Sequence, residues 1–224
     1  MNNQARGIDL PGYIESTLLR DNVTDVDIDE LCSAAIWFRF LGVCIYQEYV
    51  ACARELLAQV STRLVTVVNF PHGNLPLDEV CGQINAAIAG GADEIDYVMN
   101  LSAAHAGDWE TVATEIKTVA DLIHSHDRLL KVILETCLLS DEQKVMAAGI
   151  ALRQQADFVK TSTGFSTGGA TVDDVRLLRA TVGSAIGVKA SGGIRDRDTA
   201  IAMINAGANR LGTSSGLAII GAAR

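Results

Sequence analysis

The sequence predicts an α/β protein, a (β/α)8 TIM barrel that forms a single domain over residues 1–224. Three observations support this prediction. Eight short apolar or β-branched runs recur along the chain, and a helical pattern separates each from the next. The length of 224 residues is near the lower end for one such barrel. The composition, 49% hydrophobic but only 5% aromatic, is typical of packed βα units.

Strands and helices alternate in the predicted order. Such alternation implies parallel strand pairing and right-handed crossovers. An open doubly wound sheet is the competing topology, but eight regular units favour closure, and no G-x-G-x-x-G follows the first run. We expect strands at 13–19, 42–46, 64–70, 94–100, 129–136, 157–163, 185–191 and 208–214, and helices at 25–41, 48–60, 77–90, 102–126, 140–156, 172–182 and 197–206.

Local signals mark several helix ends. Ser140, Thr171 and Asp196 each stand where a helix N-cap is expected, and Gly90 and Gly207 fall at expected helix ends. Linkers and low-complexity tracts are absent from the sequence. The sequence therefore places no boundary between domains.

The charge distribution restricts the class of partner. A formal net charge of −9 argues against nucleic acid or an anionic membrane surface as the main partner. Residues 1–128 contain 7 basic and 19 acidic residues, whereas residues 129–224 contain 11 basic and 8 acidic residues. An anionic small molecule is therefore expected to be attracted to the C-terminal half.

Five cysteines are scattered without a C-x-x-C pair, which is typical of reduced thiols in a cytosolic protein. The first thirteen residues contain no apolar run of the kind found in a signal peptide, and the apolar stretches are too short to span a bilayer. We therefore expect a cytoplasmic protein.

Several of the predicted strands carry a charge inside an otherwise apolar run, and four of these charges are candidates for chemistry. They are Asp96, Lys131, Lys160 and Lys189, and each stands where an apolar residue is expected. A single lysine on a strand most often makes an ion pair in the core or extends to the rim. Lys160 and Lys189, however, lie on adjacent predicted strands, each before a small polar segment (VKTST, VKASG). Parallel neighbours at the same height bring their two ammonium groups close together.

Such a lysine pair has a chemical use. A lysine must be neutral to attack a carbonyl, and a nearby positive charge together with desolvation lowers a lysine pKa. The protonated imine that then forms withdraws electrons and permits carbon–carbon cleavage or aldol addition. Asp96 is the expected acid or base, acting through a bound water. A salt bridge from Asp96 to Lys131 or Lys160 is an alternative that is compatible with this role.

Two glycine-rich loops are candidates for binding phosphate. Ser191-Gly192-Gly193 follows the seventh predicted strand, and residues 212–216 (GTSSG) follow the eighth. In TIM barrels these loops frequently hold phosphate with backbone N–H groups. Thr163-Gly164 after the sixth strand is a third candidate wall, and ordinary turn formation is the alternative for all three loops.

Other candidate residues carry weaker signals. His124 and His126 have the spacing of a metal pair but lack acidic or cysteine companions, so we expect no metal site. Cys44 ends the second predicted strand, where it either lines the pocket or is a buried structural thiol.

Seven segments along nearly the whole chain resemble the deoxyribose-phosphate aldolases, a family of class I lyases. They are CIYQEYV, VTVVNFPHG, GADEIDYVMN, LKVILET, DFVKTSTGFSTGGAT, VKASGGIR and GANRLGTSSG. The resemblance implies reversible cleavage of 2-deoxy-D-ribose 5-phosphate, a phosphosugar of deoxyribonucleoside catabolism, to D-glyceraldehyde 3-phosphate and acetaldehyde. It also implies no cofactor, no metal, and a homo-oligomer, either dimer or tetramer.

The resemblance also implies roles for individual residues. Lys160 forms the Schiff base, Lys189 keeps it unprotonated, and Asp96 relays protons. The supporting network consists of Lys131, Glu15, Thr17 and Cys44. The residues expected to bind phosphate are Thr163, Gly164, Gly192, Gly193, Ser214 and Ser215.

The chain departs from the family pattern in its first strand. Aspartate followed by histidine or leucine is usual there, whereas this chain has Glu15 and Ser16. Gln47 stands where the family commonly has proline. Two alternatives therefore remain: a Schiff-base aldolase with another carbonyl donor, or a barrel that binds phosphosugars without turnover. The intact set of Asp96, Lys160 and Lys189 argues for an enzyme.

Overall fold

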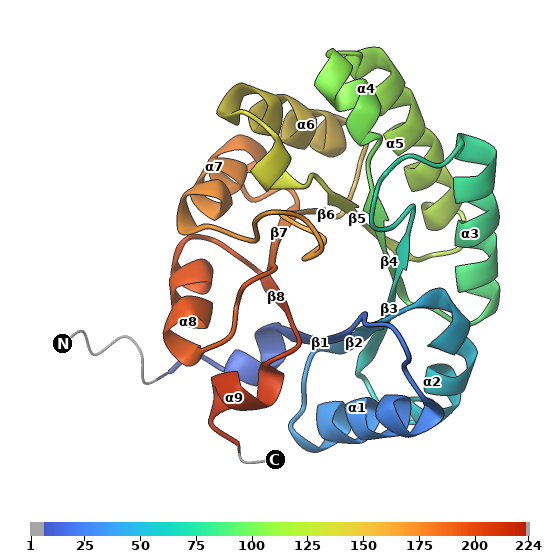
Figure 1. Ribbon diagram of the computed structural model, residues 1–224, viewed down its shortest axis with the longest axis vertical. Helices are drawn as coiled ribbons and strands as arrows, with labels where there is room; N and C mark the ends of the chain where they lie inside the picture. Colours follow the sequence, from blue (N-terminus) through green and yellow to red (C-terminus); the bar gives the residue numbers. More distant parts are fainter. Residues whose placement is uncertain (1–6, 223–224) are drawn as a thin grey trace.

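The computed structural model describes residues 7–222, in which eight parallel strands form a closed barrel. The strands pair in sequence order and β8 pairs with β1, which confirms the predicted (β/α)8 barrel. The helices form an outer ring around the strands (Figure 1). The strands are β1 (Ile14–Leu18), β2 (Gly42–Ile45), β3 (Arg63–Val68), β4 (Glu94–Val98), β5 (Leu129–Ile133), β6 (Phe158–Lys160), β7 (Gly187–Ser191) and β8 (Arg210–Thr213).

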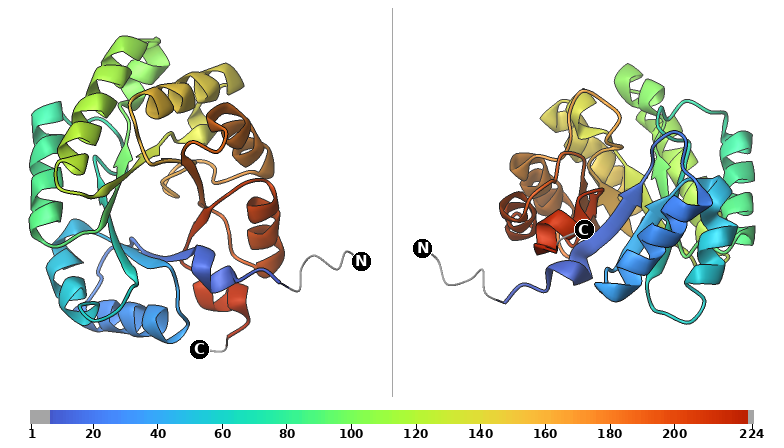
Figure 2. Two further views of the ribbon diagram at one scale, coloured as in Figure 1. Left: turned by 180° about the vertical axis from the view of Figure 1, so that it is seen from behind. Right: turned by 60° about the horizontal axis from the view of Figure 1, so that its bottom comes forward.

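The helices follow the predicted alternation, and the described residues contain four further short helical segments. Short 3-10 segments precede β1 and follow β2 and β5, and a short helix follows β8. The first 3-10 segment, η2, packs against the last helix, α9 (Figure 2). The helices are α1 (Asp25–Trp37), α2 (Val50–Leu56), α3 (Leu77–Ala89), α4 (Leu101–Ala106), α5 (Trp109–His124), α6 (Asp141–Arg153), α7 (Val172–Val182), α8 (Arg197–Asn205) and α9 (Gly216–Ile220), with η2 (Leu10–Tyr13), η3 (Gln47–Tyr49) and η4 (Thr136–Leu138).

The three predicted N-caps are confirmed. The side chains of Ser140, Thr171 and Asp196 each accept a hydrogen bond from the backbone N–H three residues later. Ser140 also forms a reciprocal capping box with Gln143. These caps fix where α6, α7 and α8 begin, and thereby the lengths of the loops before them.

One prediction about the helices is wrong. A continuous helix was expected over 102–126, but the structure has α4 and α5, which are separated at Gly107 and Asp108. Gly107 ends α4 in the left-handed conformation (φ 75°), and the Asp108 side chain caps α5 by accepting from the N–H of Thr111. The local glycine and aspartate signals therefore outweigh the helical periodicity around them.

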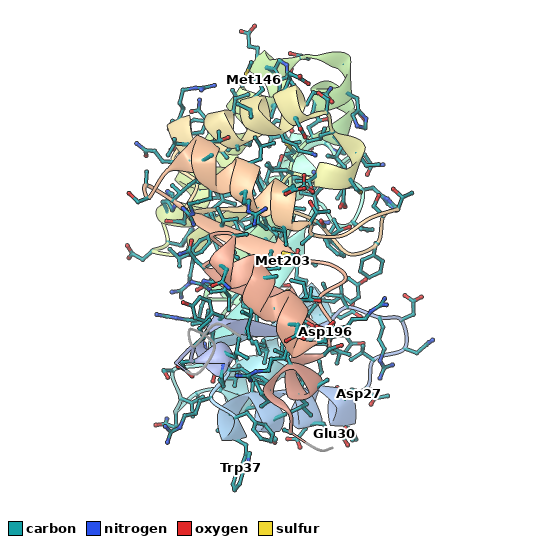
Figure 3. All side chains as sticks on the ribbon, turned by 90° about the vertical axis from the view of Figure 1, so that its left-hand side faces the viewer. Asp27, Glu30, Trp37, Met146, Asp196 and Met203 are labelled. Carbon is teal, nitrogen blue, oxygen red and sulfur yellow. The ribbon has the colours of Figure 1, made fainter. Side chains whose placement is uncertain are left out.

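The aliphatic core lies between the strands and the helices. Ile84 of α3, Ile116 of α5 and Leu178 of α7 are fully buried there. In contrast, Trp37 at the end of α1 is 80% exposed and projects away from the barrel (Figure 3). Among residues 7–222, no helix combines the length and apolar character needed to cross a membrane.

The strand register brings the charged strand residues together. Lys160 pairs with Lys189 across β6 and β7, and Lys189 pairs with Arg210 across β7 and β8. Asp96 pairs with Lys131 across β4 and β5. Paired residues of parallel strands face the same side of a sheet. These charges therefore lie on one side of the sheet, and the contact of Asp96 on β4 with Lys189 on β7 places that side inside the barrel.

Candidate active site

Asp96 links the three buried lysines. Its Oδ2 accepts hydrogen bonds from Lys160 Nζ at 2.8 Å and from Lys189 Nζ at 2.6 Å, and its Oδ1 accepts from Lys131 Nζ at 2.9 Å. Burial alone would raise the pKa of Asp96, but Lys131, Lys160 and Lys189 hold that pKa well below its usual range. Asp96 is therefore an anion shared by three amines on the consecutive strands β5, β6 and β7.

A second set of charges lies next to this centre. The Glu15 carboxylate bonds to Lys189 Nζ, lies 2.9 Å from Arg210 Nη1 and lies 3.5 Å from Lys131 Nζ. Glu94 lies 2.7 Å from both Lys131 Nζ and Arg210 Nη1. Every charged group here thus has at least one partner of opposite sign, as burial requires.

The charges of this network decide which groups stay ionised. Burial acts to raise the pKa of Glu15, but Lys131 and Lys189 lower it to about 2. Burial alone would lower the pKa of Lys189, but Asp96 and Glu15 raise it. Lys189 is therefore an ammonium ion at neutral pH, next to Lys160.

Glu94 and Arg210 also belong to this network, although the sequence pattern did not indicate them as site residues. They stand at or near the first position of their strands, where a charged residue usually faces solvent at the rim. The Arg210 guanidinium also lies 4.5 Å from the centre of the Phe158 ring, which covers its apolar face. Their alignment with Lys131 and Lys189 follows only from the register.

A pocket of about 350 Å³ opens above the network, and Lys160 lines it. Its walls come from the loops after β1, β6, β7 and β8. Arg20 and Arg195 add positive charge, and no carboxylate lines the pocket in the part of the chain that the structure describes. The lining residues are Thr17, Leu18, Leu19, Arg20, Lys160, Thr163, Gly164, Phe165, Ser191, Gly192, Gly193, Ile194, Arg195, Gly212, Thr213 and Ser214.

The pocket includes five of the six residues expected to bind phosphate: Thr163, Gly164, Gly192, Gly193 and Ser214. Ser215 stands outside the lining set, and its N–H donates to Thr213 Oγ1 at 2.9 Å. Gly192 has φ 86°, and an added Cβ would lie 3.0 Å from the Cα of Gly169. Only glycine therefore suits that position without strain.

The structure separates the expected supporting residues into two groups. Glu15 and Lys131 belong to the buried charges, and Thr17 lines the pocket. Cys44 is fully buried against Val65 and Val67, and burial raises the pKa of its thiol to about 11. Of the two alternatives for Cys44, the structure favours the buried thiol.

The two histidines considered as a metal pair lie at and just after the end of α5. His124 Nε2 is 2.9 Å from Asp157 Oδ2, and both side chains are partly exposed. Within residues 7–222 there is no group of three or more His, Cys, Asp or Glu side chains arranged to hold a metal ion.

Comparison with known proteins identifies the family. Residues 12–222 match the model of the DeoC/LacD family aldolases. The chain belongs to this aldolase family. The aldolase is 49% identical over 212 residues to a deoxyribose-phosphate aldolase of Brevibacillus brevis, with 95% of each chain covered. It is 45% identical over 220 residues to that of Thermococcus gammatolerans, covering 97% of this chain and 98% of the relative.

Solved structures agree with this assignment. The aldolase superimposes on a protein described as QR15, an aldolase, with a TM-score of 0.90, 36% identity and 95% of each chain covered. It also matches the deoxyribose phosphate aldolase of Aeropyrum pernix, described as having a unique tetrameric structure. That match has a TM-score of 0.89 and 32% identity, and covers 95% of this chain and 89% of the other.

Proposed function

We propose that this aldolase reversibly cleaves 2-deoxy-D-ribose 5-phosphate to D-glyceraldehyde 3-phosphate and acetaldehyde through a Schiff base on Lys160. The observation that carries the proposal is the position of Lys160: it lines the pocket while its nitrogen shares Asp96 with the ammonium of Lys189. The curated relatives named deoxyribose-phosphate aldolase support this choice of substrate.

The reaction begins at the open-chain aldehyde. The neutral amine of Lys160 adds to C1, and loss of water from the carbinolamine leaves a protonated imine. Removal of the proton from the C3 hydroxyl allows the C2–C3 bond to break. The bonding electrons move into the imine as an enamine, and glyceraldehyde 3-phosphate leaves. Protonation of the enamine carbon and hydrolysis then release acetaldehyde and restore Lys160.

Asp96 and Lys189 have complementary roles in these steps. Asp96 is ionised, so it accepts protons through a bound water and stabilises the iminium cation beside it. Lys189 remains an ammonium ion, so it repels a second positive charge on Lys160 and supplies protons to the relay. Lys131 and Glu15 keep these two groups in place from the other side.

We assign the substrate's phosphate to the pocket wall formed by the loops after β6, β7 and β8. Gly192 and Gly193 offer backbone N–H groups, and Ser214 adds a hydroxyl donor. Arg20 and Arg195 make this part of the pocket positive, which favours a dianion. Ser215 supports this wall through the hydrogen bond from its N–H to Thr213 Oγ1, and does not itself line the pocket.

Covalent trapping tests the proposal. Incubation with 2-deoxyribose 5-phosphate, reduction with borohydride and peptide mass spectrometry should find the adduct on Lys160, and Lys160→Ala should abolish it. Trapping with other carbonyl donors alone would favour a related aldolase. Binding of the phosphosugar without any adduct would favour a barrel that does not turn over its ligand.

We further propose that the aldolase is a cytoplasmic homo-oligomer. The Aeropyrum pernix relative is described as tetrameric, and Val26 and Trp37 expose apolar side chains on α1. All five cysteines are free thiols, which suits a reducing compartment. Sedimentation velocity should show a dimer or tetramer, and a monomer at micromolar concentration would contradict this.

A further inference from the structure

Glu135 has a buried carboxylate that is hydrogen-bonded to Thr163, a residue that lines the pocket. It follows β5 and is 2% exposed. Its Oε2 accepts from Thr163 Oγ1 at 2.5 Å, and its two oxygens lie 3.2 and 3.3 Å from the Thr163 N–H. In the described chain, all of its side-chain hydrogen bonds are with Thr163. One side chain thus receives both donors of a single pocket residue.

The backbone of Glu135 is unusual for a residue with a Cβ. Its φ and ψ are 56° and 61°, in the left-handed region that glycine adopts without cost. Conformations of this kind persist where the surrounding contacts outweigh their cost, and they cluster at functional sites. The adjacent backbone is firmly paired, because Leu134 N–H donates to Lys160 O at 3.0 Å and Thr136 N–H to Thr161 O at 2.9 Å.

The effect of Glu135 extends along the loop after β6. Thr163 Oγ1 donates to Glu135 and also accepts from the N–H of Phe165 at 3.1 Å. This one hydroxyl therefore holds the residues before and after Gly164 in place. The Phe165 ring packs edge-on against Phe70, with ring centres 5.3 Å apart. Thr163, Gly164 and Phe165 are therefore held as one unit against the pocket.

This unit separates two cavities. On one side is the pocket that Lys160 lines, and on the other is a smaller cavity of about 150 Å³. Thr163 and Phe165 line both, whereas Glu135 and His72 line only the smaller one. Without its anchor, the loop has free volume behind it into which it can withdraw from the substrate.

We propose that Glu135 is a positioning residue of this aldolase, whose carboxylate holds residues 163–165 against the pocket and thereby sets the affinity for the phosphosugar. The inference rests on the proposed function, in which the loop after β6, with Thr163 and Gly164, forms part of the wall that binds phosphate. Burial raises the pKa of Glu135, against the hydrogen bonds from Thr163 and the nearby charge of Lys160.

Glu135→Gly is the decisive variant, because it removes the carboxylate while glycine suits the left-handed backbone. We expect the KM for 2-deoxyribose 5-phosphate to rise about tenfold or more, the effect of losing hydrogen bonds to a charged group. The kcat/KM for unphosphorylated 2-deoxyribose, and trapping of acetaldehyde on Lys160, should change less than about twofold, since neither uses the phosphate wall. The melting temperature confirms that the variant is folded.

Three further variants make the test specific. Glu135→Gln can still accept from the Thr163 N–H and donate to its hydroxyl, so its KM should stay within about threefold of wild type. Thr163→Val should raise KM, and combining it with Glu135→Gly should add little, because both changes break one linkage. Glu55→Ala, on the exposed face of α2, is the matched control and should leave KM unchanged.

The outcomes are separable. A folded Glu135→Gly with unchanged KM would overturn the inference. A KM in Glu135→Gln as high as that in Glu135→Gly would also overturn it, because the negative charge and not the hydrogen bonds to Thr163 would then be what the site requires. If Glu135→Gly does not fold, an unchanged KM in Thr163→Val overturns it. Absence of any Lys160 adduct in the wild type would instead overturn the proposed function.

Discussion

Lys189→Met is expected to shift the pH profile of imine formation towards alkaline pH by about two units. Lys160 and Lys189 donate to the same Asp96 oxygen at 2.8 and 2.6 Å, so their nitrogens are no further apart than these two distances combined. For two unit charges about 5 Å apart, an effective dielectric constant of about 20 gives a repulsion of about 3 kcal/mol, or about two pH units.

The direction of the shift follows from which group is charged. Asp96 and Glu15 raise the pKa of Lys189 although burial opposes them, so Lys189 is an ammonium ion at neutral pH. Its repulsion favours the neutral amine of Lys160. In the variant, among the described residues, Asp96 keeps Lys160 and Lys131 as hydrogen-bond partners, and the ammonium ion that opposed a positive charge at Lys160 is gone. Imine formation at neutral pH should therefore fall about 100-fold and recover in alkaline solution.

The assay is borohydride trapping of acetaldehyde across a pH series, with the modified fraction of Lys160 read from intact mass. Acetaldehyde carries no phosphate, so changes at the glycine loops do not enter the measurement. Lys117→Met removes an exposed lysine of α5 and serves as the control. A profile in Lys189→Met that coincides with the wild type, or that shifts towards acid, would refute the electrostatic argument.

Two further predictions concern the charge network and the phosphate wall. Because Lys131 and Lys189 lower the pKa of Glu15 from 4.5 to about 2 against the effect of burial, its stabilisation is present above pH 4.5 and lost as the pH falls through 2. Glu15→Gln should reduce the free energy of unfolding by about 3 kcal/mol at neutral pH and remove that acid sensitivity, as urea titrations would show; equal acid sensitivity in both proteins would contradict this. Gly192→Ala should raise the KM for the phosphosugar about tenfold while preserving acetaldehyde trapping. Gly107 also has a positive φ but has open space around it, so Gly107→Ala should leave the KM unchanged. Equal KM values in the two glycine variants would argue against the phosphate wall.

The fold could be predicted because its periodic signals are strong. The strands recur in short apolar or β-branched runs at regular intervals, and the caps at Ser140, Thr171 and Asp196 fix where helices begin. The division between α4 and α5 was lost because the helical pattern continues across it. The correct signal is local, a glycine followed by an aspartate, and the periodicity on either side of it conceals it.

The active site was predictable in part, for a physical reason. Asp96, Lys160 and Lys189 interrupt apolar strands, where a charge is costly and therefore conspicuous. Arg210 begins its strand, where a charge is ordinary, so its place in the network needs the register with Lys189. Glu135 follows a strand, and nothing in its neighbours along the chain indicates a left-handed backbone or the contact with Thr163.

The charged interior of the barrel limits how this protein can evolve. Four cations and three anions share the space that aliphatic layers fill in many barrels of this kind, and each one balances several others. Replacing one member alone changes the net charge of an interior that is largely shielded from water and leaves its former partners without a bond. Divergent lineages should therefore exchange these residues in compensating sets, so that the interior changes in steps while the surface around it drifts freely.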